Sequence, residues 1–290
     1  MTDRRERWPE WLKMLYIENS AGDPIPIERK LCSAELHTVC REAGCPNLGR
    51  CFGQGRATFL ILGNICTRNC AFCGISKGRP LPPEQDEPDR VAGAVKELGV
   101  RYAVITSVTR DDLPDGGAGI YALAGMKIKT AVPGIKTEFL IPDMMGNEEA
   151  LRSVLEGRAD VLNHNIETVP SLYSRIRPEA SFSTSLAVLK FFAGMGVRTK
   201  TGIMVGLGET RDELNDAIDE AADTGISMLT VGQYLSPSRR HYPVQRYYEL
   251  EEYEQIRGFA MSKGIKCVVA GPFVRSSFNA EETAKEIIGG

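Results

Sequence analysis

Short apolar runs alternate with longer amphipathic segments along most of the chain, from about residue 57 onward. The short runs are rich in β-branched and aromatic residues and are bounded by polar or glycine-containing turns, which is typical of strands. The six runs that predict strands are 57–63, 101–108, 136–143, 161–168, 198–206 and 226–235. Apolar residues recur at helical spacing over 86–98, 147–157, 181–194, 210–224 and 249–263. This alternation predicts βα units around a parallel sheet.

The number and spacing of these units favour one kind of α/β fold. About six βα units suit an open or partial (β/α)6 TIM-like barrel better than a doubly wound sheet, and no G-x-G-x-x-G fingerprint follows the first strand. In such a barrel the loops at the carboxyl ends of the strands build the active site. We therefore expect a barrel over 54–265, with an N-terminal extension (1–53) and a C-terminal segment (266–290) that cover the barrel mouth.

The two ends of the chain lack the βα rhythm. Residues 1–53 look irregular, with a helix signal over 8–16 and a proline-containing stretch, DPIPIERK (23–30), that predicts an extended chain. The last residues, NAEETAKEIIGG (279–290), predict a short helix. Both ends are therefore expected to be extensions of the barrel.

Composition and charge argue against several classes of protein. The formal net charge is −3, from 35 Lys and Arg against 38 Asp and Glu, whereas a nucleic-acid-binding face needs a basic stripe. No segment approaches the roughly 20 apolar residues that span a bilayer, and the N-terminus lacks the apolar region of a secretory signal. We therefore expect a cytoplasmic protein that binds neither nucleic acid nor membrane. Disulfides are rare in that compartment, so clustered cysteines indicate metal binding.

Six of the eight cysteines form two triplets with different spacings. These are Cys40, Cys45 and Cys51 (C-x4-C-x5-C), and Cys66, Cys70 and Cys73 (C-x3-C-x2-C). A structural zinc site has four closed ligands and a [4Fe-4S] cluster usually has four cysteines, so a group of three leaves one metal position open. Two such groups indicate redox or radical chemistry. Cys32 and Cys267 lie outside the triplets and are expected to be small buried apolar residues.

The second triplet directly follows the first predicted strand, which places it at the barrel mouth. One loop with this spacing can wrap three corners of an iron–sulfur cubane and leave the fourth iron open for the amino and carboxylate groups of S-adenosylmethionine. With the aromatic Phe72 inside the motif, the segment resembles the radical S-adenosylmethionine superfamily. The alternative is a zinc site completed by a distant histidine, but His37, His164 and His241 are all remote from the triplet in sequence.

Most of the chain, from about Cys40 to Phe278, resembles the lipoyl synthase family. The resemblance begins with CREAGCPNLGRCFGQGRATFLILGNICTRNCAFC (40–73) and continues through VITSVTRDDLPDGGA (104–118), NHNIETV (163–169), TGIMVGLGET (201–210), VGQYLSPSRRHYPV (231–244) and GPFVRSSF (271–278). It implies that the second triplet holds the radical [4Fe-4S] cluster. It also implies that Cys40, Cys45 and Cys51 hold an auxiliary [4Fe-4S] cluster, which is sacrificed as the sulfur donor.

The resemblance also implies the missing ligand of the auxiliary cluster. In lipoyl synthases a C-terminal RSSY motif supplies a serine oxygen, and here RSSF makes Ser277 the matching ligand, with Ser276 as the second choice. An oxygen ligand matches iron–sulfur chemistry poorly, so it can leave and open the cluster. Without the triplets, residues 275–277 would be interpreted as a solvated turn. Phe278 replaces the family's tyrosine, and Arg50 stands where relatives often have an acidic residue.

Polar side chains on the predicted strand 161–168 are candidates for cofactor contacts. If side chains alternate along it, Asn163, Asn165 and Glu167 share one face and His164 and Ile166 share the other. Unpaired buried polar groups cost about 1–3 kcal/mol each, so such an inner face demands partners. Asn165 and Glu167 are the candidates for the ribose hydroxyls of the cofactor. A polar ladder between neighbouring strands is the alternative, and His164 is expected to have a packing role.

Other cofactor contacts follow from the resemblance. The loop after the second predicted strand, with Thr106 and Ser107, resembles the region that meets the methionine end of the cofactor in this superfamily. Residues 110–112 of the same loop either face the cofactor or form a surface ion-pair cluster. Arg177 follows the fourth predicted strand and is a candidate for a bidentate contact with the cofactor carboxylate. Lys200 is a further candidate on the inner face of the barrel.

The resemblance finally implies a reaction and its partners. 5′-Deoxyadenosyl radicals remove hydrogen from C6 and C8 of an octanoyl chain on a lysine of a lipoyl carrier protein or domain, and sulfide from the auxiliary cluster takes its place. An electron donor such as ferredoxin or flavodoxin and a cluster-assembly protein are the other implied partners, and no catalytic residue is expected beyond the cluster ligands. Another sulfur-inserting radical enzyme and a non-catalytic iron–sulfur electron carrier stay open as alternatives. Cleavage of S-adenosylmethionine by the reduced protein would exclude the carrier.

Overall fold

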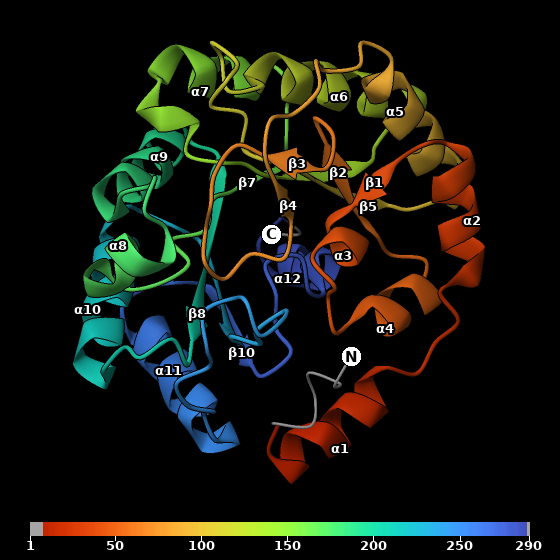
Figure 1. Ribbon diagram of the computed structural model, residues 1–290. Coiled ribbons are helices and arrows are strands. Elements are labelled where there is room, and N and C mark those ends of the chain that lie inside the picture. The colour runs from red at the N-terminus through yellow and green to blue at the C-terminus, as the bar shows by residue number, and fades with distance from the viewer. Residues whose placement is uncertain (1–7, 289–290) are drawn as a thin grey trace. The chain divides into compact units, whose positions relative to one another are not determined.

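The computed structural model describes residues 8–288 and divides them into two units, each with parallel strands and covering helices (Figure 1). The first unit contains residues 8–12, 69–73 and 161–288, and the second contains residues 13–68 and 74–160. Helix α1 (Glu10–Asn19) begins the described chain. None of the helices within residues 8–288 is both long enough and apolar enough to cross a membrane.

The second unit contains a sheet with strand order β1-β2-β5-β6. Strands β2, β5 and β6 run parallel, β1 is antiparallel to β2, and β3 and β4 form a separate parallel pair. The bounds are β1 (His37–Thr38), β2 (Thr58–Ile61), β3 (Ile65–Cys66), β4 (Ser76–Lys77), β5 (Tyr102–Ser107) and β6 (Lys136–Leu140). Every residue of β2 is buried, as expected for a strand that is covered on both faces.

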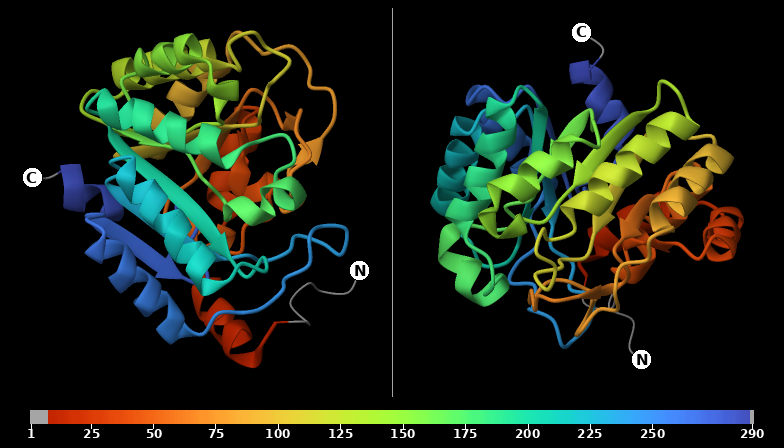
Figure 2. Two further views of the ribbon diagram at one scale, coloured as in Figure 1. Left: turned by 90° about the vertical axis from the view of Figure 1, so that its left-hand side faces the viewer. Right: turned by 90° about the horizontal axis from the view of Figure 1, so that it is seen from above.

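The helices of the second unit follow its strands in the βα order. They are α2 (Ile25–Ser33), α3 (Val39–Glu42), α4 (Leu48–Gly53), α5 (Glu87–Leu98), α6 (Ala118–Ala131) and α7 (Glu148–Leu155), with a 3₁₀ turn η2 (Met144–Gly146). Helices α5, α6 and α7 lie in a row (Figure 2). Local signals fix their ends: α5 stops at Gly99, with φ of 66°, and the Asn147 side chain accepts hydrogen bonds from the first turn of α7.

Helix α6 passes very close to the turn after α7, and this predicts an unusual response to substitution. A Cβ atom on Gly125 would lie 2.2 Å from the carbonyl oxygen of Gly157, whereas a Cβ on the exposed Gly93 of α5 would meet nothing within 4 Å. Gly93→Ala should therefore raise the free energy of unfolding by about 0.5–1 kcal/mol, as in an ordinary helix interior. Gly125→Ala should instead lower it by about 1–3 kcal/mol, because the backbone must shift. Denaturant unfolding of the two variants tests the close contact, and a stabilising Gly125→Ala would contradict it.

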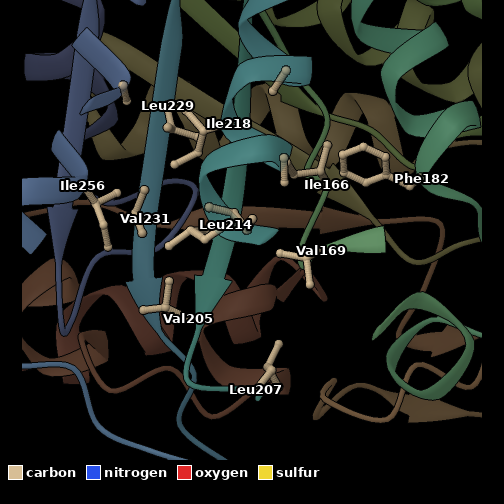
Figure 3. Packing of buried hydrophobic residues seen from close by; sticks show 14 of the residues in the cluster. Ile166, Val169, Phe182, Val205, Leu207, Leu214, Ile218, Leu229, Val231 and Ile256 are labelled. Atoms are coloured by element: carbon tan, nitrogen blue, oxygen red, sulfur yellow. The ribbon is translucent and has the colours of Figure 1, made fainter. Parts of the chain in front are cut away.

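The first unit is a parallel sheet with order β7-β8-β9-β10. Its elements are β7 (Val161–Asn163), η3 (Pro170–Leu172), α8 (Tyr173–Ile176), α9 (Phe182–Gly194), β8 (Arg198–Val205), α10 (Arg211–Asp223), β9 (Met228–Gln233), α11 (Leu250–Ser262), β10 (Cys267–Gly271) and α12 (Ala280–Ile288). The core forms where the helices cover the sheet. Leu214 and Ile218 of α10 point toward Val205 on β8 and toward Leu229 and Val231 on β9 (Figure 3).

This packing also sorts the side chains of β8 by face. Ile203 and Val205 belong to the core under the helices, so residues of the opposite parity, such as Lys200 and Gly202, face the other side of the sheet. A Cβ on Gly202 would lie 2.7 Å from Oδ1 of Asn165. The absence of a side chain at Gly202 therefore lets the polar residues after β7 approach β8 closely.

Most sequence-based elements are confirmed, with several corrections. All six predicted strands and all five predicted helices are present, but β7 ends at Asn163 rather than at 168. The stretch 23–30 is wrong as an extended segment, because α2 occupies it with proline in the first helical turn, where no N–H is needed. Helix α6 and strand β10 had not been identified. Cys32 is exposed rather than buried, while Cys267 is buried as expected. The division at residues 53 and 265 stays a prediction.

Candidate functional site

The first cysteine triplet lies in the second unit on two short helices and the turn between them. Cys40 is in α3, Cys51 is in α4, and Cys45 lies in the connection. The N–H of Cys45 donates to the carbonyl of Cys40 at 2.9 Å, and the N–H of Arg56 donates to the carbonyl of Cys51 at 2.9 Å. These bonds fold the chain from Cys40 to Arg56 back on itself, so the three cysteines lie in one compact segment.

The three thiols of this triplet influence one another electrostatically. Burial raises the pKa of Cys40 to about 12, and the Cys45 and Cys51 thiols add to the shift, while hydrogen bonds from Thr58 oppose it. Burial is the largest cause that raises the pKa of Cys51 to about 11, and the Cys45 thiol is the second. Three thiolates in one poorly solvated place repel one another unless a cationic centre compensates them. The donor set thus fits an iron–sulfur cluster, which thiolates hold.

The second triplet is distributed over both units. Cys66 ends β3 in the second unit, and Cys70 and Cys73 belong to the segment 69–73 of the first unit. The N–H of Cys73 donates to the carbonyl of Cys70 at 3.3 Å, which closes a turn between them. Thiolates at this spacing, with a fourth position left open, fit the cluster expected from the sequence. Within residues 8–288, no three His, Cys, Asp or Glu side chains converge as they would around a single metal ion.

Arg68 anchors the part of the motif next to Cys66. Its guanidinium is only 5% exposed and forms bidentate pairs with Asp111, at 2.6 and 2.9 Å, and with Asp143, at 2.7 and 2.7 Å. Its backbone N–H donates to the sulfur of Cys66 at 3.4 Å. Asp111 and Asp143 lie in the loops after β5 and β6, so one buried arginine ties the cysteine loop to two strand ends. Sequence reasoning had not identified Arg68.

The segment 69–73 is held by backbone and side-chain bonds within the first unit. The N–H of Ala71 donates to the carbonyl of Ile176, and the N–H of Tyr242 donates to the carbonyl of Ala71, both at 2.9 Å. Nε2 of His241 donates to the carbonyl of Cys73 at 3.1 Å. His241 is remote in sequence but adjacent to the triplet in space, and it touches a carbonyl rather than a thiol. Phe72, the aromatic residue of the motif, packs partly buried against the core.

The chain after β7 departs from the alternation that the sequence suggested. Glu167 has φ of 63°, and the N–H of Thr168 donates to the carbonyl of Ile166 at 2.8 Å. This is a γ-turn with positive φ at its centre, the rarer and strained form. The expectation that Asn163, Asn165 and Glu167 share one strand face is therefore wrong. Strained backbone of this kind is found where a side chain must be aimed at a functional site.

The side chains of Asn165 and Glu167 nevertheless lie next to each other. Nδ2 of Asn165 donates to the Glu167 carboxylate at 3.0 Å and to Oγ of Ser276 at 2.6 Å, while its buried Oδ1 has no partner among the described residues. Burial raises the pKa of Glu167 above its usual range, and the Arg177 cation and the Asn165 hydrogen bond offset part of this shift. A buried acceptor without a partner next to an acceptor-rich carboxylate fits a ligand that donates hydrogen bonds, as ribose hydroxyls do.

The other polar cofactor candidates are buried or hydrogen-bonded within the protein. Nη1 of Arg177 donates to the carbonyl of Asn165 at 3.1 Å and to the Tyr173 hydroxyl at 3.2 Å, so part of this guanidinium shapes the chain after β7. Lys200 is fully buried in β8. In the second unit, Thr106 donates to the carbonyl of Leu140 at 2.9 Å, and Ser107 accepts a bond from the Tyr121 hydroxyl at 3.0 Å.

Residues 110–112 form ion pairs rather than an open polar loop. Arg110 is 1% exposed and pairs with Asp112 at 2.8 Å, and Asp111 pairs with Arg68. Arg110 is thus buried, contrary to a surface cluster, although the ion-pair interpretation itself is confirmed. In the C-terminal RSSF segment, the N–H of Phe278 donates to the carbonyl of Arg275 at 2.8 Å. Ser276 is engaged by Asn165, as described above, and Ser277 is partly buried in the same turn.

The second unit also contains an open cavity of about 640 Å³. Residues of α2 and β1 line one side, and the loops 62–65 and 80–84 line the other. None of the residues proposed from the sequence as cluster ligands or cofactor contacts borders it. The cavity is therefore separate from the candidate site.

Comparison with known proteins connects this geometry to a family. Residues 60–221 match the Radical SAM superfamily. A lipoyl synthase of Caldanaerobacter subterraneus subsp. tengcongensis is 48% identical over 277 residues, which cover 95% of this chain and 96% of that protein. A lipoyl synthase of Histophilus somni is 49% identical over 276 residues, covering 94% of this chain and 86% of that protein.

Solved structures resemble the chain in fold at low sequence identity. Methylornithine synthase (PylB) matches with a TM-score of 0.54 at 16% identity, over 88% of this chain and 84% of that chain. Escherichia coli coproporphyrinogen III oxidase (HemN), described as a radical SAM enzyme, matches with a TM-score of 0.53 at 13% identity, over 71% of this chain and 52% of that chain. These likenesses confirm the α/β fold class with a partial TIM-like barrel that the strand pattern predicted.

Proposed function

This chain belongs to the lipoyl synthase family of the radical S-adenosylmethionine superfamily, and from that premise we propose how its residues divide the work of the reaction. The enzyme is a sulfurtransferase that inserts two sulfur atoms, at C6 and C8, into a protein-bound octanoyl-lysine chain. It uses S-adenosylmethionine and two [4Fe-4S] clusters, which supply when bound the radical that removes hydrogen and the sulfide that replaces it. The 48% identity over 95% of the chain carries this conclusion.

The two triplets take different roles in this proposal. Cys66, Cys70 and Cys73 hold the cluster that binds S-adenosylmethionine, in the loop that Arg68 and His241 fix in place. The auxiliary cluster is held by the first triplet and by Ser277. The mutual influence of the Cys40, Cys45 and Cys51 thiols supports a common centre for them. The bond from Asn165 to Ser276 supports Ser277 as the ligand, because the Ser276 oxygen is already engaged.

The cofactor contacts of this proposal begin with two residues that follow β7. Asn165 and Glu167 bind the ribose hydroxyls. Two observations support this: the buried Oδ1 of Asn165 has no partner among the described residues, and Glu167 has the strained positive φ that is found at functional sites. Phe72, Thr106, Ser107, Arg177 and Lys200 complete the cofactor contacts, Arg177 toward the cofactor carboxylate. Part of the Arg177 guanidinium also holds the carbonyl of Asn165, so it couples the carboxylate contact to the ribose contact.

Three partners are part of the proposal. The substrate is an octanoylated lipoyl carrier protein or domain, a ferredoxin or flavodoxin supplies electrons, and a cluster-assembly protein rebuilds the consumed cluster. We place the enzyme in the cytoplasm, because none of the eight cysteines is in a disulfide and a reducing compartment keeps cysteines available as cluster ligands.

Reconstitution followed by incubation with an octanoyl-lysine peptide tests the function. We expect about eight iron atoms per chain from two four-iron clusters, and lipoyl peptide together with one 5′-deoxyadenosine for each C–H bond broken. Iron and sulfide analysis and mass spectrometry of the peptide are the measurements. Formation of 5′-deoxyadenosine without sulfur insertion into the peptide would favour a different sulfur-inserting radical enzyme and contradict the proposed substrate.

A further inference from the structure

A rigid turn after β9 presents two arginines to solvent. Oγ of Ser238 accepts from the N–H of Arg240 at 3.2 Å and pairs with Nδ1 of His241 at 2.8 Å, and the N–H of His241 donates to the carbonyl of Ser238 at 3.2 Å. These bonds fix the backbone of residues 238–241, here named the arginine turn. Arg239 and Arg240 are both exposed, so their side chains take no part in holding the turn together.

The arginine turn is attached to the segment that carries Cys70 and Cys73. Nε2 of His241 donates to the carbonyl of Cys73 at 3.1 Å. The next residue, Tyr242, donates its N–H to the carbonyl of Ala71, inside the cysteine motif. The His241 side chain and its hydrogen bond therefore join the arginine turn directly to the backbone of Cys73, a proposed cluster ligand.

A third exposed cation adjoins a residue that is hydrogen-bonded to the same segment. The N–H of Ala71 donates to the carbonyl of Ile176, and Arg175 of α8 immediately precedes Ile176 and is exposed. Within residues 8–288, the side chains of Arg175, Arg239 and Arg240 form no ion pair. The nearby Glu179 accepts a bond from the N–H of Asn69 at 3.3 Å. The chain as a whole has a net charge of −3, and these three exposed cations belong to elements that are hydrogen-bonded to the segment 69–73 or directly adjoin such elements.

We propose that the arginine turn, with Arg175, is the docking surface for an acidic one-electron donor protein that reduces the radical cluster. The proposal rests on the proposed function, which needs one electron for each cleavage of S-adenosylmethionine. The donor, a low-potential flavin or iron–sulfur protein, loses that electron and the cluster gains it, and no group is transferred across the interface. The arginine turn is attached to the backbone of Cys73, and the electron must reach the cluster that Cys73 is proposed to hold. This favours the electron donor over the lipoyl carrier protein as the partner that docks here.

Charge reversal compared between two reductants tests this surface. The variant is Arg239→Glu/Arg240→Glu, and the matched control is Lys190→Glu/Lys266→Glu, which reverses two exposed cations of the same unit. Lys190 lies near the end of α9, before β8, and Lys266 immediately precedes β10. Lys266 therefore lies at the amino end of a strand and Lys190 on the helix that leads to one, whereas the arginine turn follows the carboxyl end of β9.

With reduced flavodoxin of net negative charge and low salt, we expect 5′-deoxyadenosine to form roughly tenfold more slowly in the arginine variant and at the wild-type rate in the control. The deficit should shrink at high salt, where surface charges are screened. Arg239→Lys/Arg240→Lys should retain most of the rate, because it keeps the charge. With dithionite, which needs no docking surface, all three variants should match the wild type.

Two outcomes would overturn the inference. One is a flavodoxin-driven rate that falls no further in the arginine variant than in the control. The other is an unchanged flavodoxin-driven rate with a raised KM for the octanoylated carrier protein, which would assign the surface to the carrier. Failure of the proposed function would look different, since the wild type would then form no lipoyl peptide with dithionite.

Discussion

Cys45→Ala is expected to abolish lipoyl product while 5′-deoxyadenosine still forms. Cys45 lies between α3 and α4, and its thiol influences the pKa of both Cys40 and Cys51. Losing this central thiolate should prevent assembly of the auxiliary cluster, because only two cysteines would remain to hold it. The radical cluster uses other ligands, so cleavage of S-adenosylmethionine should continue. Iron content should fall to about four atoms per chain.

The matched control is Cys70→Ala, in the second triplet. It should lose 5′-deoxyadenosine and lipoyl product together, because no radical can form, and it should also retain about four iron atoms per chain. Chromatographic assay of 5′-deoxyadenosine and mass spectrometry of the octanoyl peptide distinguish the two variants. Lipoyl peptide made at the wild-type level by Cys45→Ala would contradict the sacrificial role of the first cluster. Cleavage of S-adenosylmethionine by Cys70→Ala would contradict the assignment of the radical cluster.

The barrel was predictable because its strands and helices repeat a simple pattern. Each strand is a short apolar run and each helix has one apolar face, so their periods differ clearly. Helix α6 could not be predicted in this way because its sequence, AGIYALAGMKIKTA, is apolar on most sides and has no polar face to set a period. Strand β10, CVVAG, was missed because the βα repeat was expected to end at residue 265, so this run fell in the C-terminal segment. Helix α2 shows that proline at a helix start can be mistaken for an extended chain.

The cysteines of the site were predictable from spacing, but their supports were not. Arg68 lies within the motif, yet its partners Asp111 and Asp143 are brought to it by the ends of β5 and β6. His241 reaches the carbonyl of Cys73 from 168 positions along the chain. Such pairs depend on which strand ends meet, and the periodicity of one sequence does not report this. The γ-turn at Glu167 was equally hidden, because nothing in the residue type announces a positive φ.

Ser277→Cys is expected to preserve both clusters and yet sharply reduce sulfur insertion. Cysteine thiolate is the usual ligand of iron–sulfur clusters, so it should hold the auxiliary cluster at least as well as a serine oxygen does. A firmer ligand would resist the loss that opens the cluster to a carbon radical. Iron content and 5′-deoxyadenosine formation should therefore stay near the wild-type values, while the yield of lipoyl peptide falls at least tenfold, a loss that corresponds to about 1.4 kcal/mol of activation free energy.

Ser276→Cys is the control that the structure offers for this experiment. Ser276 lies in the same turn and accepts the 2.6 Å hydrogen bond from Asn165, so its replacement perturbs the Asn165 side chain rather than a cluster ligand. Its effect should fall on the KM for S-adenosylmethionine, through Asn165, and should leave more lipoyl peptide than Ser277→Cys does. If Ser277→Cys instead makes lipoyl peptide at the full rate, Ser277 is not a departing ligand. The RSSF segment would then act only as a turn, closed by the bond from Phe278 to Arg275.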